Sequence, residues 1–264
     1  MTAQSNPTEW GESIPARILR IKLTKFLAGL TSCLVLALVT TANSVAGSSK
    51  DDPKGDVSLS LGVFEPRGSG DLWRLNESEF TQSPSDFDGL TGGVRVGSFV
   101  NNYLAFDVGG SYYDTTVRSE DRLFITIDGD SVHHHARLRL LPLTIDMRVM
   151  PFGRTRPDGN GRAVNRVVPY LGIGGGAMLW SYLEQGSFAD PNSLTLFHAR
   201  YSSRGVTPEY HGVLGAEITL NPEVALFAEG RVSRAKDDLS ADFQGFDKFD
   251  LSGTSVSIGT RIRF

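Results

Sequence analysis

The sequence predicts an all-β fold, an antiparallel up-and-down transmembrane β-barrel of about eight strands with long external loops. Two observations predict it. Apolar and polar residues alternate with a period of two over segments of roughly ten residues, the length of a tilted strand that crosses a bilayer. The connections between these segments are alternately long and short, as in a barrel whose two chain ends lie on the side of the short turns.

The last segment, Ser252–Phe264, shows the alternation most clearly. Val256, Ile258, Ile262 and Phe264 fall on one face, and Ser, Gly and Arg side chains fall on the other. In a membrane barrel the apolar face meets lipid and the polar face meets the lumen, whereas in a soluble sandwich the apolar face meets a second sheet. Because these four residues end on an aromatic side chain in register with the apolar face, the segment resembles the C-terminal assembly signal of bacterial outer-membrane barrels.

Seven further segments precede it and show the same alternation. In chain order they are Asp56–Pro66, Leu90–Val100, Tyr103–Tyr113, Ala136–Val149, Val167–Ser181, Tyr210–Leu220 and Val224–Val232. Asn101-Asn102 and Asn221-Pro222-Glu223 are predicted tight turns, because Asn tolerates positive φ. Residues 67–89, 114–134, 182–206 and 233–250 are polar and are predicted to be external loops, and 151–166 is a turn rich in Gly, Pro and Arg.

Three segments resemble strands of a known family, the outer-membrane protein β-barrel domain family, of the opacity-protein and OmpA membrane-domain type. They are L-L-P-L-T-I-D-M-R at Leu140–Arg148, V-P-Y-L-G-I-G-G-G at Val168–Gly176 and L-F-A-E-G-R at Leu226–Arg231. The resemblance implies location in the outer membrane of a Gram-negative cell, with outer-membrane lipids, lipopolysaccharide and the barrel-assembly machinery as partners. Since such proteins share a fold and not a function, it implies no particular activity.

The N-terminal region reads as a targeting segment. Residues 1–46 are predicted to be a cleaved signal peptide with a polar extension, 47–55 a short periplasmic lead and 56–264 the barrel. Basic residues precede an apolar run, Phe26–Val39, and small residues follow it up to the predicted cleavage site after Ala46. The alternatives are an uncleaved membrane anchor and a lipoprotein in which Cys33 is lipidated.

Composition excludes several classes of function. The 264 residues carry a formal net charge of -4, which argues against a nucleic-acid partner. The single cysteine excludes a disulfide framework and a Cys-based zinc site. Adjacent residues of a strand point to opposite faces, so His133, His134 and His135 cannot all ligate one metal ion in extended geometry. We therefore expect no metal site and no cofactor.

Charged residues occupy the predicted inner face in mid-strand. They are Arg95, Asp107, Asp146, Arg148, Glu217, Glu229, Arg231, Arg261 and Arg263. A barrel of about eight strands has room for side chains and little else. These residues are therefore predicted to form an internal salt-bridge network, and the alternative is a narrow polar path for ions or small solutes.

The function predicted from these features is structural or concerned with surface interaction, through the external loops and without enzymatic activity. A narrow, porin-like pore and a lipid-modifying enzyme are the alternatives, although the His-x-Ser motif of such enzymes is absent. His211 is expected to face the lumen near Glu217. Loop carboxylates are expected to be solvated or to bridge lipopolysaccharide through divalent cations. The aromatic residues predicted for an interfacial girdle are Trp73, Phe80, Tyr112, Tyr113, Trp180 and Tyr182.

Overall fold

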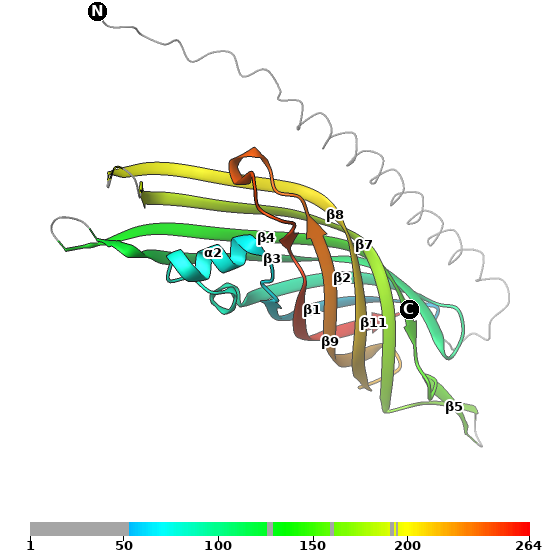
Figure 1. The fold of residues 1–264 in the computed structure, drawn as a ribbon. Helices are drawn as coiled ribbons and strands as arrows, with labels where there is room; N and C mark the ends of the chain where they lie inside the picture. The colour runs from blue at the N-terminus through cyan, green and yellow to red at the C-terminus, as the bar shows by residue number, and fades with distance from the viewer. Residues whose placement is uncertain (1–52, 126–128, 159–160, 191–192, 194) are drawn as a thin grey trace, which may run out of the picture.

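A computed structural model describes residues 53–125, 129–158, 161–190, 193 and 195–264 (Figure 1). The predicted signal peptide and residues 47–52 of the predicted lead lie outside these residues. No helix in the described part of the chain is long and apolar enough to cross a membrane.

Antiparallel strands form a closed ring. The ring strands are β1 (Gly55–Pro66), β2 (Gly89–Phe99), β3 (Leu104–Ile125), β4 (Ser131–Val149), β7 (Val167–Ala189), β8 (Leu196–Thr219), β9 (Val224–Asp237) and β11 (Gly253–Arg263). Each pairs with the next, β11 pairs with both β9 and β1, and β8 pairs with β9, which closes the ring. This confirms the predicted up-and-down barrel, and each predicted segment coincides with part of one of these strands, apart from single residues at some ends.

The two ends of the barrel differ. One end of the barrel, at the lower right in Figure 1, holds both ends of the described chain and the connections β2–β3, β4–β7 and β8–β9. We call it the lower end. The β4–β7 connection there includes a hairpin, β5 (Thr155–Asp158) and β6 (Gly161–Val164). At the upper end are the connections predicted to be long and external. Successive connections therefore alternate between the two ends of the barrel as predicted, although their lengths do not all follow the prediction.

Two of the predicted external loops are wrong. Residues 114–125 and 131–134 continue β3 and β4, and residues 183–189 and 196–206 continue β7 and β8. These four strands have 22, 19, 23 and 24 residues, whereas β1, β2 and β11 have 12, 11 and 11. We call their extension, residues 114–125, 131–140, 180–189 and 196–205, the upper wall. It projects on one side of the ring (Figure 1).

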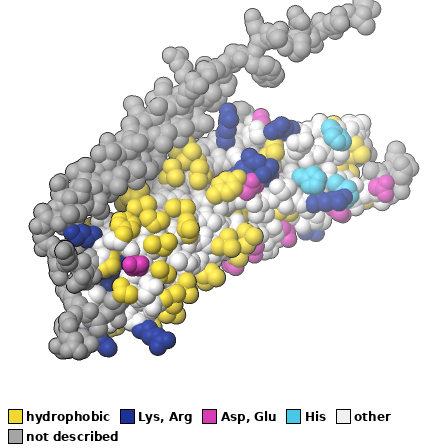
Figure 2. All heavy atoms as spheres, turned by 180° about the vertical axis from the view of Figure 1, so that it is seen from behind, with side chains coloured by type: hydrophobic (Ala, Val, Ile, Leu, Met, Phe, Trp, Pro, Cys, Tyr) yellow, Lys and Arg dark blue, Asp and Glu magenta, His cyan; other side chains and the backbone are white. Residues whose placement is uncertain are grey.

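The lower part of the ring is apolar outside. Its exposed, outward-facing side chains include Leu59, Leu61, Val94, Val96, Phe106, Leu141, Ile145, Leu171, Ile173, Leu214, Ile218, Leu226, Val256, Ile258 and Ile262. Leu61, Ile258 and Leu214 are 61%, 67% and 71% exposed. Figure 2 shows apolar side chains over one half of a face of the molecule and charged ones over the other half. We call this apolar surface the outer belt.

Shorter elements fold into the upper mouth of the ring. The β1–β2 connection forms α2 (Asp71–Glu79) and a 3-10 helix, η2 (Pro84–Phe87). The β9–β11 connection forms η3 (Ala241–Phe243) and β10 (Phe249–Asp250), which pairs with β9. Because Leu72, Trp73 and Phe87 are buried, the predicted loop 67–89 packs inward and does not extend into solvent.

Candidate functional site

The lowest layer of the lumen is ionic. Three arginines and three carboxylates meet there, Asp56, Asp107, Arg148, Glu217, Arg261 and Arg263, each at most 3% exposed. Arg148 donates from Nη2 to Asp56 Oδ2 at 2.9 Å and from Nε to Asp107 Oδ2 at 3.0 Å. Glu217 accepts from Arg261 at 2.9 Å and from Arg263 at 2.6 Å. Opposite charges balance, so the layer closes the lower lumen without an unpaired ion.

A second ionic layer lies above the first. Arg95 donates to both carboxylate oxygens of Glu229, at 2.7 and 2.9 Å, and Tyr170 donates its hydroxyl hydrogen to Glu229 at 3.0 Å. Such a bidentate Arg–carboxylate pair fixes geometry as well as charge. The side chains of Arg95 and Glu229 are only 11% and 3% exposed.

His211 belongs to a further cluster on β4, β8 and β9. Its Nε2 contacts Asp146, and its Nδ1 is 3.1 Å from Glu209. Arg231 is 3.4 Å from the second oxygen of Asp146. His211 therefore faces the lumen as predicted, but its carboxylate partners are Asp146 and Glu209 and not Glu217, because its side chain turns toward β4. Gly174 makes this possible, since a Cβ there would lie 2.0 Å from Asp146 Oδ1 and 2.5 Å from His211 Nε2.

All nine charged residues predicted for the inner face lie inside the ring and take part in these ion pairs. The sequence interpretation missed Asp56, Glu209 and Tyr170. Each has the same strand parity as a predicted inward residue, for example Asp56 with Ser58 on β1, so a consistent count by two would have found them. Val256, Ile258, Ile262 and Phe264 face outward and are exposed. Their part in assembly stays a prediction.

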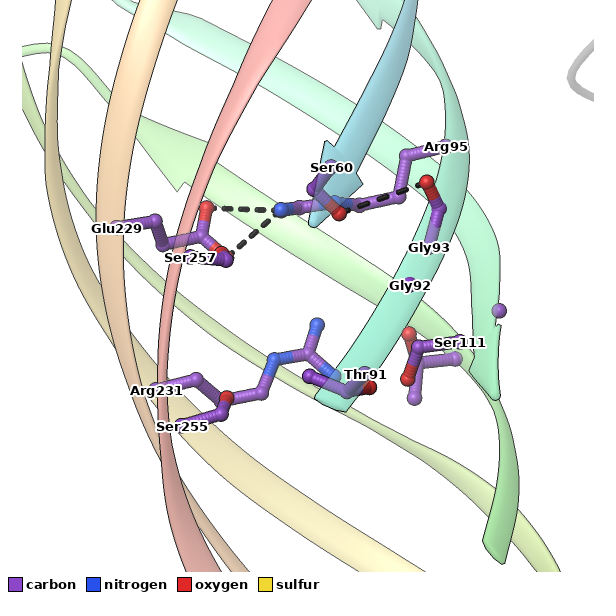
Figure 3. A pocket seen from close by; sticks show the side chains of 12 residues that line it. Ser60, Thr91, Gly92, Gly93, Arg95, Ser111, Glu229, Arg231, Ser255 and Ser257 are labelled. Atoms are coloured by element: carbon purple, nitrogen blue, oxygen red, sulfur yellow. Dashed lines mark hydrogen bonds and ion pairs between the residues drawn. The ribbon is translucent and has the colours of Figure 1, made fainter. Parts of the chain in front are cut away.

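Two small cavities lie in the lumen among the residues that the structure describes. A cavity of about 50 Å³ adjoins the second ionic layer and is lined by hydroxyl groups, among them Ser60, Ser111 and Ser257, with Arg95, Glu229 and Arg231 in its wall (Figure 3). Ser60 donates to the carbonyl oxygen of Gly93 at 3.4 Å. A cavity of about 30 Å³ adjoins it from above. Cavities of these volumes hold a few water molecules.

An aromatic plug fills the lumen above the ionic layers. It consists of Phe64, Leu72, Trp73, Phe87, Tyr113, Val117, Ala136, Leu138, Leu140, Met178, Trp180, Tyr182, Ala235, Phe243, Phe249 and Leu251. Trp73 stands at its centre, with ring centroids 5.2 Å from Phe87 and 5.5 Å from Phe249. Its Nε1 donates to the carbonyl oxygen of Asp250 at 3.2 Å. The plug joins α2, η2 and β10 to the inner face of the ring.

Five of the six aromatic residues predicted for an interfacial girdle are in the wrong place. Trp73, Phe80, Tyr113, Trp180 and Tyr182 are buried and face inward, and only Tyr112 is exposed, at 52%. The reason is that the alternation reverses its meaning above the outer belt. There the outer face meets water, so polar side chains point outward and apolar side chains point into the lumen.

A buried polar cluster lies within the upper wall. Asn76 on α2 donates to the hydroxyl of Tyr182 at 2.9 Å and to Glu184 Oε1 at 3.2 Å, and the Tyr182 hydroxyl donates to Glu184. Burial raises the pKa of the Glu184 carboxyl above its ordinary value. His134 is also buried, against Phe80 and Phe188, with ring centroids 4.4 and 5.2 Å away. Its burial lowers the pKa of the imidazole to about 4.

The described residues contain no group of three or more His, Cys, Asp or Glu side chains suited to a metal ion. His134 points inward and its neighbours His133 and His135 lie on the outer side of β4, as strand geometry requires. A Ser–His contact does occur on the outer side of the upper wall, where Ser187 Oγ is 3.4 Å from His198 Nδ1. Ser187 is half-buried and His198 is exposed.

Comparison with known proteins finds similar structures but no similar sequence. No protein-family model matches the chain, and no curated protein matches it. Neisserial surface protein A matches at 13% identity over 80% of this chain and 96% of its own, with a TM-score of 0.41. The outer membrane protein OprG from Pseudomonas aeruginosa matches at 12% identity over 82% of this chain and 99% of its own, with a TM-score of 0.44. Outer membrane protein W of E. coli matches at 13% identity over 82% of this chain and 100% of its own, with a TM-score of 0.37. A small barrel does not by itself specify an activity, and the resemblance of three strands to one barrel family stays a prediction.

Proposed function

We propose that the protein is an integral barrel of the bacterial outer membrane that presents its upper wall and mouth as a surface for interaction, and that it conducts no solutes. The outer belt supports the membrane location. On β4 the belt runs from Leu141 to Val149, and a tilted transmembrane strand needs about 9–11 residues. A continuous belt of exposed Leu, Ile and Val around a closed ring is stable against lipid and costly against water.

The observation that best supports the surface role is that two layers of side chains, the lower ionic layer and the aromatic plug, fill the lumen. The lower ionic layer pairs each arginine with carboxylates across the ring, and the aromatic plug fills the mouth above it. Passage of an ion requires the separation of at least one buried ion pair and the displacement of α2. Side chains that fill the lumen and brace the upper wall therefore support a rigid display scaffold.

Site-directed labelling tests the location and orientation. Arg200 lies on the exposed outer side of the upper wall, and Glu223 lies in the exposed lower β8–β9 turn. In intact cells, a membrane-impermeant maleimide is expected to label Arg200→Cys and to leave Glu223→Cys unlabelled until the outer membrane is opened. Equal labelling of both variants in intact cells, or labelling of neither after lysis of the outer membrane, contradicts the proposed arrangement.

Conductance tests the closed lumen. The purified protein in planar bilayers is expected to show no conductance steps, and neutralisation of Glu229 alone is expected not to produce an ion-selective channel, because the plug remains. A wild-type conductance that changes when Arg148 or Glu229 is neutralised indicates the narrow pore. Release of fatty acid from lipopolysaccharide or phospholipid, lost on His198→Ala, indicates an enzyme.

A further inference from the structure

The outer side of the upper wall changes from apolar to charged within one row of side chains. The uppermost apolar row across β4, β7 and β8 consists of Leu141, Leu179 and Val206. Two residues further up each strand, the register aligns Arg139, Ser181 and Arg204. This row is the boundary between the outer belt and the water-exposed part of the upper wall.

A groove of about 240 Å³ lies across this boundary. The apolar row forms its lower part, Arg139 and Arg204 flank its upper part, and Tyr112 lies at one side. Ser181 explains why the groove exists, because this small side chain stands between the two arginines in the register and leaves the space between them open. We call it the β7 groove.

Positive charge exceeds negative charge around the β7 groove. On the outer side, Asp114 accepts two hydrogen bonds from Arg137, at 2.6 and 2.7 Å, besides one from Arg139 at 3.1 Å and one from the Tyr112 hydroxyl at 2.9 Å. On the inner side, Asp237 accepts a hydrogen bond from Trp180 Nε1 at 2.8 Å. Arg204 forms no ion pair or side-chain hydrogen bond with any residue that the structure describes. The groove therefore attracts an anion, and Arg204 has donors available for it.

The apolar lower part identifies the kind of anion. A free anion makes no use of Leu141, Leu179 and Val206, which continue downward into the outer belt. A lipid fits both parts, since its acyl chain lies along the belt and its phosphate lies at the polar boundary. We propose that the β7 groove binds a phosphorylated glycolipid of the outer leaflet, with a phosphate held between Arg139 and Arg204. This inference rests on the proposed function, because it requires the belt to lie in the outer membrane.

Binding of bisphosphorylated lipid A, with dephosphorylated lipid A for comparison, tests the proposal. The full chain is expressed, and the folded protein is extracted in mild detergent and titrated with each lipid by native mass spectrometry. We expect the wild-type protein to prefer the phosphorylated lipid and Arg204→Gln to weaken its binding about tenfold, as expected for the loss of one charge-assisted contact. Arg200→Gln is the matched control, since Arg200 lies on the same side of the same strand, about 13 Å further from the belt.

A second variant separates groove filling from charge. Ser181→Phe keeps every charge but occupies the space between the two arginines, so it is also expected to weaken binding. Equal affinity of the wild type for the two lipids, or unchanged affinity in both Arg204→Gln and Ser181→Phe, overturns the proposal. Each variant is first shown to be a folded barrel by its faster migration without boiling on a denaturing gel. Failure of the proposed function appears separately, as conductance or as labelling of the wrong end of the barrel.

Discussion

Substitution of Arg148 by methionine tests whether the lower ionic layer is a coupled network. Arg148 is 3% exposed in its side chain and lies 2.9 Å from Asp56, 3.0 Å from Asp107 and 3.7 Å from Glu217. Methionine keeps much of the side-chain volume but removes the charge, so Asp56 and Asp107 lose their main counter-ion while they remain buried. Loss of one partner of a buried ion pair costs about 3–5 kcal/mol, and we expect the free energy of unfolding to fall by this amount.

Part of this loss is expected to be recovered when Asp107 is neutralised as well. In Arg148→Met with Asp107→Asn, the lower layer again has equal numbers of opposite charges, with Asp56 still near Arg261 at 3.7 Å. Contacting residues of one network show interaction energies of about 0.5–3 kcal/mol, so the double variant is expected to be more stable than the sum of the single losses predicts.

The assay is urea unfolding of the protein in phospholipid vesicles, followed by tryptophan fluorescence. Arg200→Met serves as the control, because an exposed arginine of the upper wall contributes within about 0.5 kcal/mol. A loss below about 1 kcal/mol for Arg148→Met, or strict additivity in the double variant, refutes the reasoning, since either result means that the six side chains do not act as one network.

Three further predictions concern the plug, the upper wall and the glycines. Trp73→Ala is expected to cost about 3–5 kcal/mol and to raise hydrogen exchange throughout α2, which a substitution on the exposed face of that helix leaves unchanged. Burial lowers the pKa of His134 from 6.5 to about 4, so the unfolded chain binds this proton more tightly than the folded chain. The contribution of neutral His134 to the free energy of unfolding is therefore complete above about pH 6.5 and is lost as the pH falls toward 4, by at most about 3 kcal/mol. Urea unfolding at both ends of this range measures the loss, which His134→Leu removes. Gly176→Val, whose Cβ lies 1.9 Å from a backbone carbonyl oxygen, is expected to cost at least about 1–3 kcal/mol in the same assay, whereas Gly212→Val, with no atom within 4 Å, changes little.

The belt part of the barrel could be predicted because one rule holds along all of its strands. Leu59 on β1 and Ile258 on β11 point to lipid, and Asp107 and Arg148 point to the lumen, so a period of two is enough to assign both faces. The same rule failed above the belt. Trp180 and Tyr182 continue the inward side of β7. Because the outer face of the upper wall meets water instead of lipid, the apolar residues there are the inward ones.

The plug could not be predicted, because its contacts depend on a loop folding back into the ring. The segment of α2 reads D-L-W-R-L-N-E-S-E, with few apolar residues, and its composition is typical of a solvated loop. Only the tertiary structure brings Trp73 against Phe249, a residue far away in the sequence. The ion-pair partners depend on the register in the same way, as the contact of His211 with Asp146 shows.

The unequal strand lengths have a consequence for how copies of the protein meet in the plane of the membrane. β9 pairs with β8 only over Glu209–Thr219, so above Glu209 β8 has a strand partner in the described chain only in β7. The β9–β11 connection covers part of the other margin, where Ser202 donates to Asp242 and accepts from Ser240, and the margin above Ser202 pairs with no described strand. Unpaired strand margins invite edge-to-edge association. Here Arg200 and Arg204 lie along that margin, and two copies that approach through it bring like charges together. The arginines of the upper wall therefore also act against lateral sheet extension between neighbouring barrels.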